Sequence, residues 1–268
     1  MTPTRANSRS PFVLPSFSEN IHAVIQGANR GIGLGFVEQL LDCEKIDTVF
    51  ATCRAPERAE ALQSLREQHP TRLQIIPLDL AQEDTIRHAA DFVGSRTDRL
   101  ALLINVAGLL HDDSTLWPEK RLADITPENL AKSFQVNAFG PVLVAKNFQG
   151  LLNHKHRAVL ANMSARVGSI ADNHLGGWYA YRASKAAQNM FTRTMALEFK
   201  RNRSGVICVA LHPGTTDTGL SRPFQAHVPE YQLFTVGYAV RKLLNVIDGL
   251  GPEDTGSFFA FDGERIEW

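Results

Sequence analysis

The chain has 268 residues, with 28 basic side chains, 28 acidic side chains and 44% hydrophobic residues. It can therefore bury a sizeable core, and its zero formal charge argues against a basic surface for nucleic acids or anionic membranes, so we expect neither partner. No apolar run approaches the roughly 18 residues of a membrane span, and the three cysteines lack disulfide or zinc spacing, so we expect no metal and a reducing, cytoplasmic setting.

The first nineteen residues are rich in Ser and Pro, carry Arg5 and Arg9, and lack the apolar segment of a signal peptide. A transit peptide is an open alternative, but we interpret residues 1–19 as a flexible N-terminal extension. Residues 20–268 contain no repeat, low-complexity segment or linker. We interpret them as one domain.

Apolar runs alternate with amphipathic segments along this domain. Continuous Val, Ile and Leu runs are typical of strands that are covered on both faces. Strands are expected at residues 22–27, 47–54, 72–80, 100–108, 158–164, 205–214 and 257–263. Helices are expected at 31–46, 56–69, 83–95, 126–152 and 236–250, with one more containing 181–185. This alternation predicts an α/β fold, a Rossmann-type doubly wound parallel sheet in a single domain.

A glycine-rich loop, GANRGIG, follows the first predicted strand and opens the first helix. Its spacing is G-x-x-x-G-x-G, which permits a tight turn and lets the backbone approach a pyrophosphate at the helix N-terminus. Glycines alone often mark ordinary loops, but this position between strand and helix favours a dinucleotide site. The candidate residues are Gly27, Asn29, Arg30, Gly31, Ile32 and Gly33.

Two later strand ends support the same kind of ligand. Ligands of open α/β sheets bind beyond the carboxyl ends of the strands. The third strand ends at Asp79 and Leu80, and Asp79 could equally be a turn or helix-cap residue. The fourth ends in NVAG, where backbone crowding would also explain the small residues. We predict cofactor contacts from Asp79, Leu80, Asn105, Ala107 and Gly108.

The segment YRASK places Tyr181 four residues before Lys185. Residues four apart share one helix face, so an ammonium can lie beside the phenol. A cation favours the ionised form of a phenol, whose reference pKa is near 10. A solvated surface pair is the competing interpretation of YRASK taken alone. Tyr179 has no lysine partner, and we interpret it as packing or pocket wall.

Seven motifs occur in order: GANRGIG, LDL, NVAG, Asn137 in VNAFG, Ser164 in ANMSA, YRASK and HPGTTDT. Together, over residues 21–263, they resemble the short-chain dehydrogenase/reductase family in its single-domain branch. NVAGLLH and the final segment look like the C-factor-like and small carbonyl-reductase-like members. The resemblance implies a dinucleotide-binding domain over residues 20–268 and a homo-oligomer, either dimer or tetramer.

The resemblance also implies residue roles. Tyr181 would exchange a proton with the substrate oxygen, and Lys185 would lower the pKa of Tyr181 and bind the nicotinamide ribose. Ser164 would orient the substrate carbonyl, and Asn137 would hold a helix kink and a water that relays protons to Lys185. The matching cofactor segment after the sixth strand contains Pro213, Gly214 and Thr218.

The second predicted strand ends in ATCRAP, so Cys53 stands where an acid would bind the ribose hydroxyl of NAD, and Arg54 follows. A nearby arginine accommodates the 2′-phosphate of NADP. Arg30 occupies another such position in the glycine loop. Two solvated arginines are the alternative, but their joint placement predicts NADP(H) over NAD(H).

Three departures from the family pattern bear on the pocket. Gln26 stands where Thr is usual, and Val106 replaces the second Asn of NNAG. Ser164 and Tyr181 are widely separated by the insertion ADNHLGGW, which we expect to shape a pocket wall. His111 is interpreted as a loop residue, with a place in the substrate cleft as the alternative.

We predict an NADP(H)-dependent oxidoreductase that reduces an aldehyde, ketone or quinone, or oxidises the alcohol. A C-factor-like regulatory protein that binds the nucleotide with little turnover is one alternative, and an epimerase or dehydratase is another. Residues 219–235 should form a lid, with Phe224, Val228 and Phe234 giving the pocket an apolar part.

Overall fold

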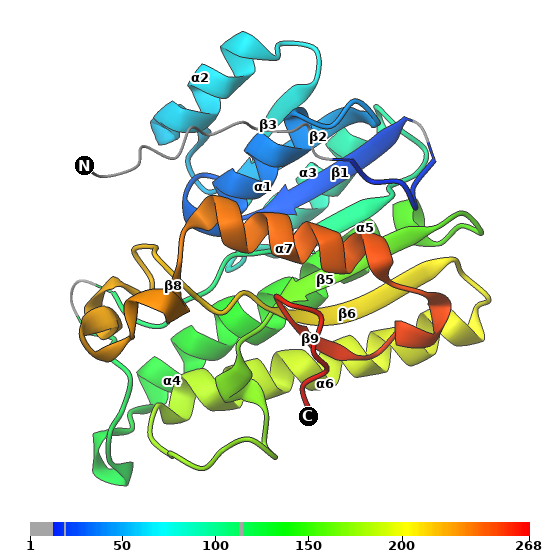
Figure 1. Cartoon of the computed structure of the whole chain (residues 1–268). Helices are drawn as coiled ribbons and strands as arrows, with labels where there is room; N and C mark the ends of the chain where they lie inside the picture. Colours follow the sequence, from blue (N-terminus) through cyan, green and yellow to red (C-terminus); the bar gives the residue numbers. More distant parts are fainter. Residues whose placement is uncertain (1–12, 19, 113–114) are drawn as a thin grey trace, which may run out of the picture.

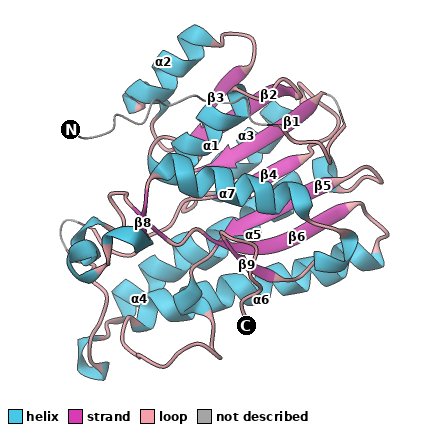
Figure 2. Cartoon of the chain, in the orientation of Figure 1, coloured by secondary structure: helices cyan, strands magenta, loops and turns pink. Residues whose placement is uncertain are grey.

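The computed structural model describes residues 13–18, 20–112 and 115–268. Its main sheet has seven parallel strands in the order β3-β2-β1-β4-β5-β6-β9, as Figure 2 shows. The chain reverses its direction of winding between β1 and β4, as in doubly wound folds. The strands are β1 (Ile21–Gln26), β2 (Ile46–Cys53), β3 (Leu73–Pro77), β4 (Leu102–Asn105), β5 (Ala158–Met163), β6 (Val206–His212) and β9 (Phe258–Ala260).

Helices cover both faces of the sheet (Figure 1). One apolar cluster joins the sheet to α1, α2 and α7, and a second joins it to α3, α5 and α6. In β1, Ala23 and Ile25 face the first cluster and Val24 the second, because successive side chains of a strand alternate between faces. The helices are α1 (Gly31–Leu41), α2 (Glu60–Gln68), α3 (Glu83–Gly94), α4 (Pro127–Phe134), α5 (Gly140–Leu152), α6 (Tyr179–Arg201) and α7 (Val236–Gly249).

The predicted Rossmann-type fold is confirmed, with two differences in helix extent. The first predicted helix ends at Leu41, and Ile46 already begins β2. The predicted helix 126–152 is divided into α4, a π-helical turn at Gln135–Phe139, and α5. A π-turn adds one residue to the helical ladder and often occurs at functional sites.

Part of the N-terminal extension expected at residues 1–19 lies within the described residues. Residues 1–12 and 19 lie outside the described residues. Residues 13–18, in contrast, pack on the domain: Leu14 and Phe17 are buried in the core, and Nζ of Lys45 donates to the carbonyl oxygen of Phe17 at 2.7 Å. The guanidinium of Arg157 lies over the Phe17 ring. Burial of two large apolar side chains therefore makes 13–18 part of the folded domain.

The chain folds back over the edge of β9 after this strand ends. The N–H of Ala260 donates to the carbonyl oxygen of Glu264, and the N–H of Ile266 donates to that of Phe258, each at 2.8 Å. The Trp268 ring stacks on the Phe258 ring with centroids 5.5 Å apart. The free edge of β9 is thus covered by residues 264–268.

Candidate active site

The glycine loop fits tightly between β1, α1 and the end of β4. Gly27 has φ 83°, and a Cβ atom added to it would lie 2.7 Å from Cβ of Ala107. A Cβ atom on Gly33 would lie 2.1 Å from the carbonyl oxygen of Gly27. Only glycine fits these two positions, which lets the backbone form a compact cradle at the start of α1.

The first turn of α1 is free to receive an anion. Arg30 is its N-cap residue, and the Arg30 side chain makes no capping hydrogen bond. The unpaired N–H groups and the helix dipole favour a phosphate there. Arg30 and Arg54 are both exposed, and Cys53 at the end of β2 is buried. The loop therefore has the backbone and the charge for a nucleotide phosphate.

The end of β4 is held by Gln26, one of the residues that depart from the family pattern. Oε1 of Gln26 accepts a hydrogen bond from the N–H of Ala107 at 3.2 Å. The Asn105 side chain is buried and donates to Oδ1 of Asn162 at 2.8 Å.

Asp79, after β3, makes a turn, since its Oδ1 accepts from the N–H of Ala81. Leu80 is buried beside α5. All the predicted strand-end residues lie at the carboxyl edge of the sheet, although the Asn105 side chain faces inward.

Asn137 lies in the π-turn, at the position of the predicted kink. Its Nδ2 donates to the carbonyl oxygen of Leu109, and its Oδ1 accepts from the N–H of the same residue, each at 2.8 Å. Nδ2 also donates to the hydroxyl of Ser184 on α6. Asn137 therefore connects the loop after β4 to α6.

Tyr181 and Lys185 lie on the first turns of α6, and both are buried. Nζ of Lys185 lies 5.8 Å from the centroid of the Tyr181 ring. A Cβ atom on Gly108 would be 3.7 Å from this Nζ atom, so the ammonium faces the end of β4. Both side chains are buried, so they do not form a solvated surface pair.

The electrostatics of this pair differ from the expectation. Burial raises the pKa of the Tyr181 phenol well above its usual value and lowers the pKa of Lys185 to about 7. The direction for Tyr181 is opposite to the expected lowering, because desolvation of the phenol outweighs the influence of the ammonium. The phenol is therefore fully protonated at neutral pH.

Ser164 follows β5 and is held by α6. Its hydroxyl donates to Oδ1 of Asn189 at 2.6 Å, and Nδ2 of Asn189 donates to the carbonyl oxygen of Gly168 at 3.2 Å. The carbonyl oxygen of Met163 accepts from Nζ of Lys185 at 2.7 Å. Ser164 therefore directly follows the residue that binds Lys185. The backbone of Met163 and Ser164 thus connects two of the predicted catalytic positions.

The segment after β6 returns to the glycine loop. Thr218 lies over Gly31, whose added Cβ atom would be 3.3 Å from Cγ2 of Thr218. The small strands β7 (Thr215–Thr216) and β8 (Leu233–Phe234) pair at the base of the lid, which Figure 1 shows beside the carboxyl ends of the main strands. Pro213 and Gly214 precede β7, and Gly214 has φ 70°. The lid base and the phosphate loop are therefore neighbours.

Four aromatic side chains from three loops form one cluster next to Tyr181. Trp178 contacts the rings of Tyr181 at 6.2 Å and of Phe224 at 5.0 Å between centroids. His111 stacks on Trp117 at 5.3 Å and lies 5.7 Å from Phe224. We call His111, Trp117, Trp178 and Phe224 the aromatic cluster. Trp178, which ends the segment ADNHLGGW, and His111, which was interpreted as a loop residue, thus both pack in this cluster.

Trp117 was not among the residues singled out from the sequence, whereas Trp178 ends the segment ADNHLGGW that was expected to shape a pocket wall. Phe234, expected in the apolar part of the pocket, lies apart from the aromatic cluster. The Phe234 ring packs on those of Phe261 and Tyr238, at 4.6 and 5.1 Å, away from the aromatic cluster. The two glycines before Trp178 were a usable signal, because Gly176 and Gly177 have φ 65° and Trp178 itself has φ 53°. Such a left-handed run fixes the direction of a loop side chain.

Glu119 holds this unusual backbone in place. Its carbonyl oxygen accepts from the N–H of Trp178 at 2.5 Å, and its Oε2 accepts from the N–H of Ala180 at 3.1 Å. Glu119 and Tyr181 both line a cavity of about 10 Å³, which is close to the space that one water needs. Glu119 therefore positions both the aromatic cluster and the N-terminus of α6.

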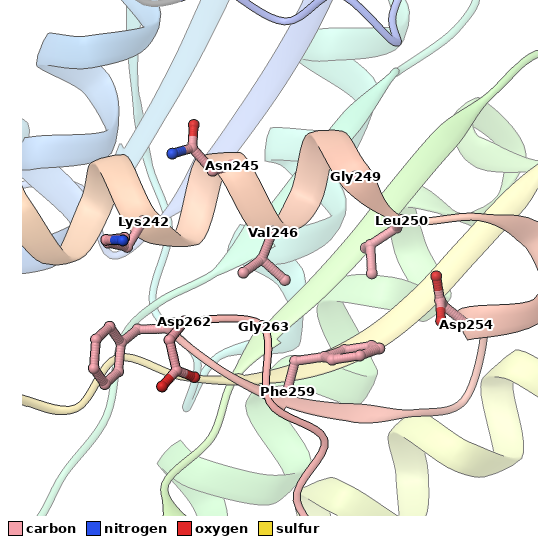
Figure 3. Close-up of a pocket in the computed structure, with 10 residues that line it drawn as sticks. Lys242, Asn245, Val246, Gly249, Leu250, Asp254, Phe259, Asp262 and Gly263 are labelled. Carbon is pink, nitrogen blue, oxygen red and sulfur yellow. The ribbon is translucent and has the colours of Figure 1, made fainter.

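A cavity of about 310 Å³ lies elsewhere, between α7 and the segment that follows β9 (Figure 3). Its lining includes Lys242, Asn245 and Asp262 and contains none of the predicted catalytic residues. Within the described residues, no group of three or more His, Cys, Asp or Glu side chains could hold a metal. The same residues include no helix long and apolar enough to cross a membrane.

Known proteins resemble this chain over most of its length. An uncharacterized oxidoreductase of Schizosaccharomyces pombe is 31% identical over 253 residues, covering 90% of this chain and 96% of that protein. The C-signal protein of Myxococcus xanthus is 37% identical over 172 residues, covering 64% of this chain and 95% of that protein. A crystal structure of NADPH-bound carbonyl reductase from chicken fatty liver has a TM-score of 0.83 and 33% identity, covering 94% of this chain and all of that one.

The sequence model of the short chain dehydrogenase family matches residues 21–229. This match includes the glycine loop, the end of β4, the π-turn, Ser164 and the pair on α6, which the structure gathers at one edge of the sheet. The chain therefore belongs to the short-chain dehydrogenase/reductase family.

Proposed function

We propose that this protein reduces the carbonyl group of a small molecule with NADPH. The observation that carries the proposal is the buried pair of Tyr181 and Lys185 next to Ser164, at the edge of the sheet where the glycine loop lies. Tyr181 gives its proton to the substrate oxygen, and Ser164 orients the carbonyl. Asn137 fixes the adjoining loop and passes protons to Lys185 through a water.

The protonation state of Tyr181 suits the donation of a proton to the substrate oxygen. Carbonyl reduction consumes one proton at the developing alkoxide, and a phenol with a raised pKa still carries that proton at neutral pH. Lys185, with its pKa lowered to about 7, can replace the proton after each turnover. The site is thus prepared for proton donation.

The cradle fits NADPH, which supplies the hydride when it is bound. Three features support this fit: the close backbone of the glycine loop, the first turn of α1 without a capping bond from Arg30, and two exposed arginines at the same edge. The residues that would hold the dinucleotide are Gly27, Asn29, Arg30, Gly31, Ile32, Gly33, Arg54, Asp79, Leu80, Asn105, Ala107, Gly108, Tyr181, Lys185, Pro213, Gly214 and Thr218.

The NADPH-bound carbonyl reductase of chicken supports the same chemistry. Similarity to the C-signal protein leaves a regulatory nucleotide-binding protein as the second candidate. Ser164, Tyr181 and Lys185 favour the enzyme, because binding a nucleotide without turnover does not need an acid positioned for proton transfer. Oxidation of NADPH with a panel of aldehydes, ketones and quinones tests the proposal, and no turnover with any of them would count against it.

We expect the enzyme to prefer NADPH over NADH by about tenfold or more, because hydrogen bonds to a charged phosphate each contribute about 1.5–3 kcal/mol. Arg54→Ala should raise KM for NADPH about tenfold and leave KM for NADH nearly unchanged. Cys53→Asp should shift the preference toward NADH. Steady-state kinetics with both nucleotides measure this, with Arg58→Ala as the control, since Arg58 is exposed nearby and pairs with Glu57. Equal KM values in the unaltered enzyme would overturn the assignment of Arg30 and Arg54.

We expect the aromatic cluster to favour apolar, flat carbonyl compounds, because aromatic faces stack on planar groups. Phe224→Ala should raise KM for an aromatic ketone at least about fivefold more than KM for a short aliphatic aldehyde. Tyr231→Ala is the matched control, since Tyr231 is an exposed aromatic of the same lid. Equal effects on both substrates would place the substrate away from Phe224.

We also propose a cytoplasmic homo-oligomer, either dimer or tetramer. Cys43, Cys53 and Cys208 are all free and buried, which suits a reducing compartment. Met190 and Leu197 expose apolar side chains on α6, which suits a helix-to-helix contact between copies.

A further inference from the structure

Gln188 lies three residues after Lys185 on α6, and only 1% of its surface is exposed. Nζ of Lys185 donates a hydrogen bond to Oε1 of Gln188 at 3.1 Å, in addition to its bond to the carbonyl oxygen of Met163. A carbonyl oxygen that accepts from an ammonium makes a charge-assisted hydrogen bond. Gln188 therefore stabilises the protonated form of Lys185.

The orientation of the Gln188 amide follows from this contact. An ammonium only donates, so the amide turns its oxygen toward Lys185 and its NH₂ group away. Nε2 is then buried, and none of the residues that the structure describes accepts a hydrogen bond from it. A buried donor without a partner destabilises a fold. An apolar side chain of the same length would avoid this cost, so packing does not explain an amide at this position.

Gln188 is also part of a polar chain through the interior. The Thr192 hydroxyl donates to the backbone carbonyl oxygen of Gln188 at 2.8 Å. Nδ2 of Asn162 on β5 donates to that hydroxyl, and Nδ2 of Asn105 on β4 donates to Asn162. These bonds fix the turn of α6 that carries Gln188 relative to two strands of the sheet. The helix turn that carries Oε1 of Gln188, the acceptor for Lys185, is thus held in a defined place.

Within the described residues, no acidic side chain binds the ammonium of Lys185. Desolvation is the cause of the lowered pKa of Lys185, and Tyr181 is the one titratable group among its neighbours in the described structure. The groups that face or pack on Lys185 include Gln188 and Tyr181 of α6, the carbonyl of Met163 on β5, Gly168, Gly108 and, beside Gly108, Asn137 of the π-turn. Two neutral acceptors, Oε1 of Gln188 and the carbonyl oxygen of Met163, therefore bind the ammonium of Lys185.

We propose that Gln188 is a positioning residue that holds the ammonium of Lys185 toward the end of β4, a role that rests on the proposed function of Lys185. Removing Oε1 of Gln188 disfavours the charged form of Lys185, so Lys185 loses its proton at a lower pH. Replacing it with a carboxylate favours the charged form, so Lys185 keeps its proton to a higher pH.

The test compares Gln188→Met, Gln188→Glu and the unaltered enzyme. We expect kcat for carbonyl reduction to fall on the alkaline side as Lys185 loses its proton. The midpoint of this fall should move about one pH unit lower in Gln188→Met and about one unit higher in Gln188→Glu. The Kd for NADPH, measured by calorimetry across the same pH range, should show midpoints displaced in the same directions.

Thr192→Val is the control, because it breaks the interior polar chain without touching Lys185. A structural role for Gln188 would lower kcat at every pH in both variants and leave the midpoints in place, which would overturn the proposal. If Gln188→Met does not fold, Gln188→Glu alone decides by the sign of its shift. A Tyr181→Phe variant that keeps its turnover would instead overturn the proposed function, so the two failures are distinguishable.

Discussion

Tyr181→Phe should lower kcat for carbonyl reduction by about 10²–10⁴-fold, which is the usual contribution of a general acid. The phenol is buried on the first turn of α6, and its raised pKa keeps it protonated. Removing only the oxygen deletes the proton donor and preserves the ring that Trp178 contacts. Single-turnover oxidation of NADPH at saturating substrate measures this effect.

The matched control is Tyr179→Phe. Tyr179 begins the same helix, but 38% of its surface is exposed, and Ala183 stands four residues after it. This variant should keep kcat within about twofold of the unaltered enzyme. The NADPH affinity should be nearly unchanged in both variants, because the hydroxyl acts on the substrate oxygen. A Tyr181→Phe enzyme with nearly normal kcat would show that another group supplies the proton.

Gly33→Val should weaken NADPH binding by about 10- to 100-fold, because overpacking of this kind typically costs about 1–3 kcal/mol. The added Cβ atom would lie 2.1 Å from the carbonyl oxygen of Gly27, so the backbone itself has to move. That movement opens the cradle at the start of α1. Calorimetric titration with NADPH and thermal unfolding measure affinity and stability separately.

Gly150→Ala is the control for the glycine substitution. Gly150 lies in α5, and a Cβ atom added there meets nothing within 4 Å. Alanine in a helix is favoured over glycine by roughly 0.5–1 kcal/mol, so this variant should bind NADPH normally and unfold at a slightly higher temperature. A folded Gly33→Val protein with unchanged affinity would place the phosphates elsewhere.

The fold was predictable because its signals are local. Buried strands alternate with amphipathic helices, and the glycine loop stands at the junction of β1 and α1. The helix break at Gln135–Phe139 was partly predictable, since the family resemblance assigned a kink to Asn137. The end of the first helix was not, because Ile46 continues the apolar pattern while already pairing with Ile21 in the sheet.

The substrate side was less predictable for a physical reason. The aromatic cluster takes its rings from loops after β4, β5 and β6, and such contacts between distant segments leave no period in the sequence. Phe224 and Phe234 are the same residue type and belong to the same lid. Phe224 nevertheless packs on Trp178, whereas Phe234 packs on Phe261. Gln188 reads as an ordinary polar helix residue until the helix face toward Lys185 is known.

The segment that folds back over β9 also limits how two copies of this chain can meet. Residues 264–266 already take the backbone hydrogen bonds at that end of the sheet, so a strand from another copy finds no unpaired edge there. At the opposite end, β3 finishes with Pro77, which has no N–H to offer a neighbouring strand. Self-association by extending the sheet is therefore disfavoured at β9, and at β3 Pro77 removes one backbone donor that a neighbouring strand would use.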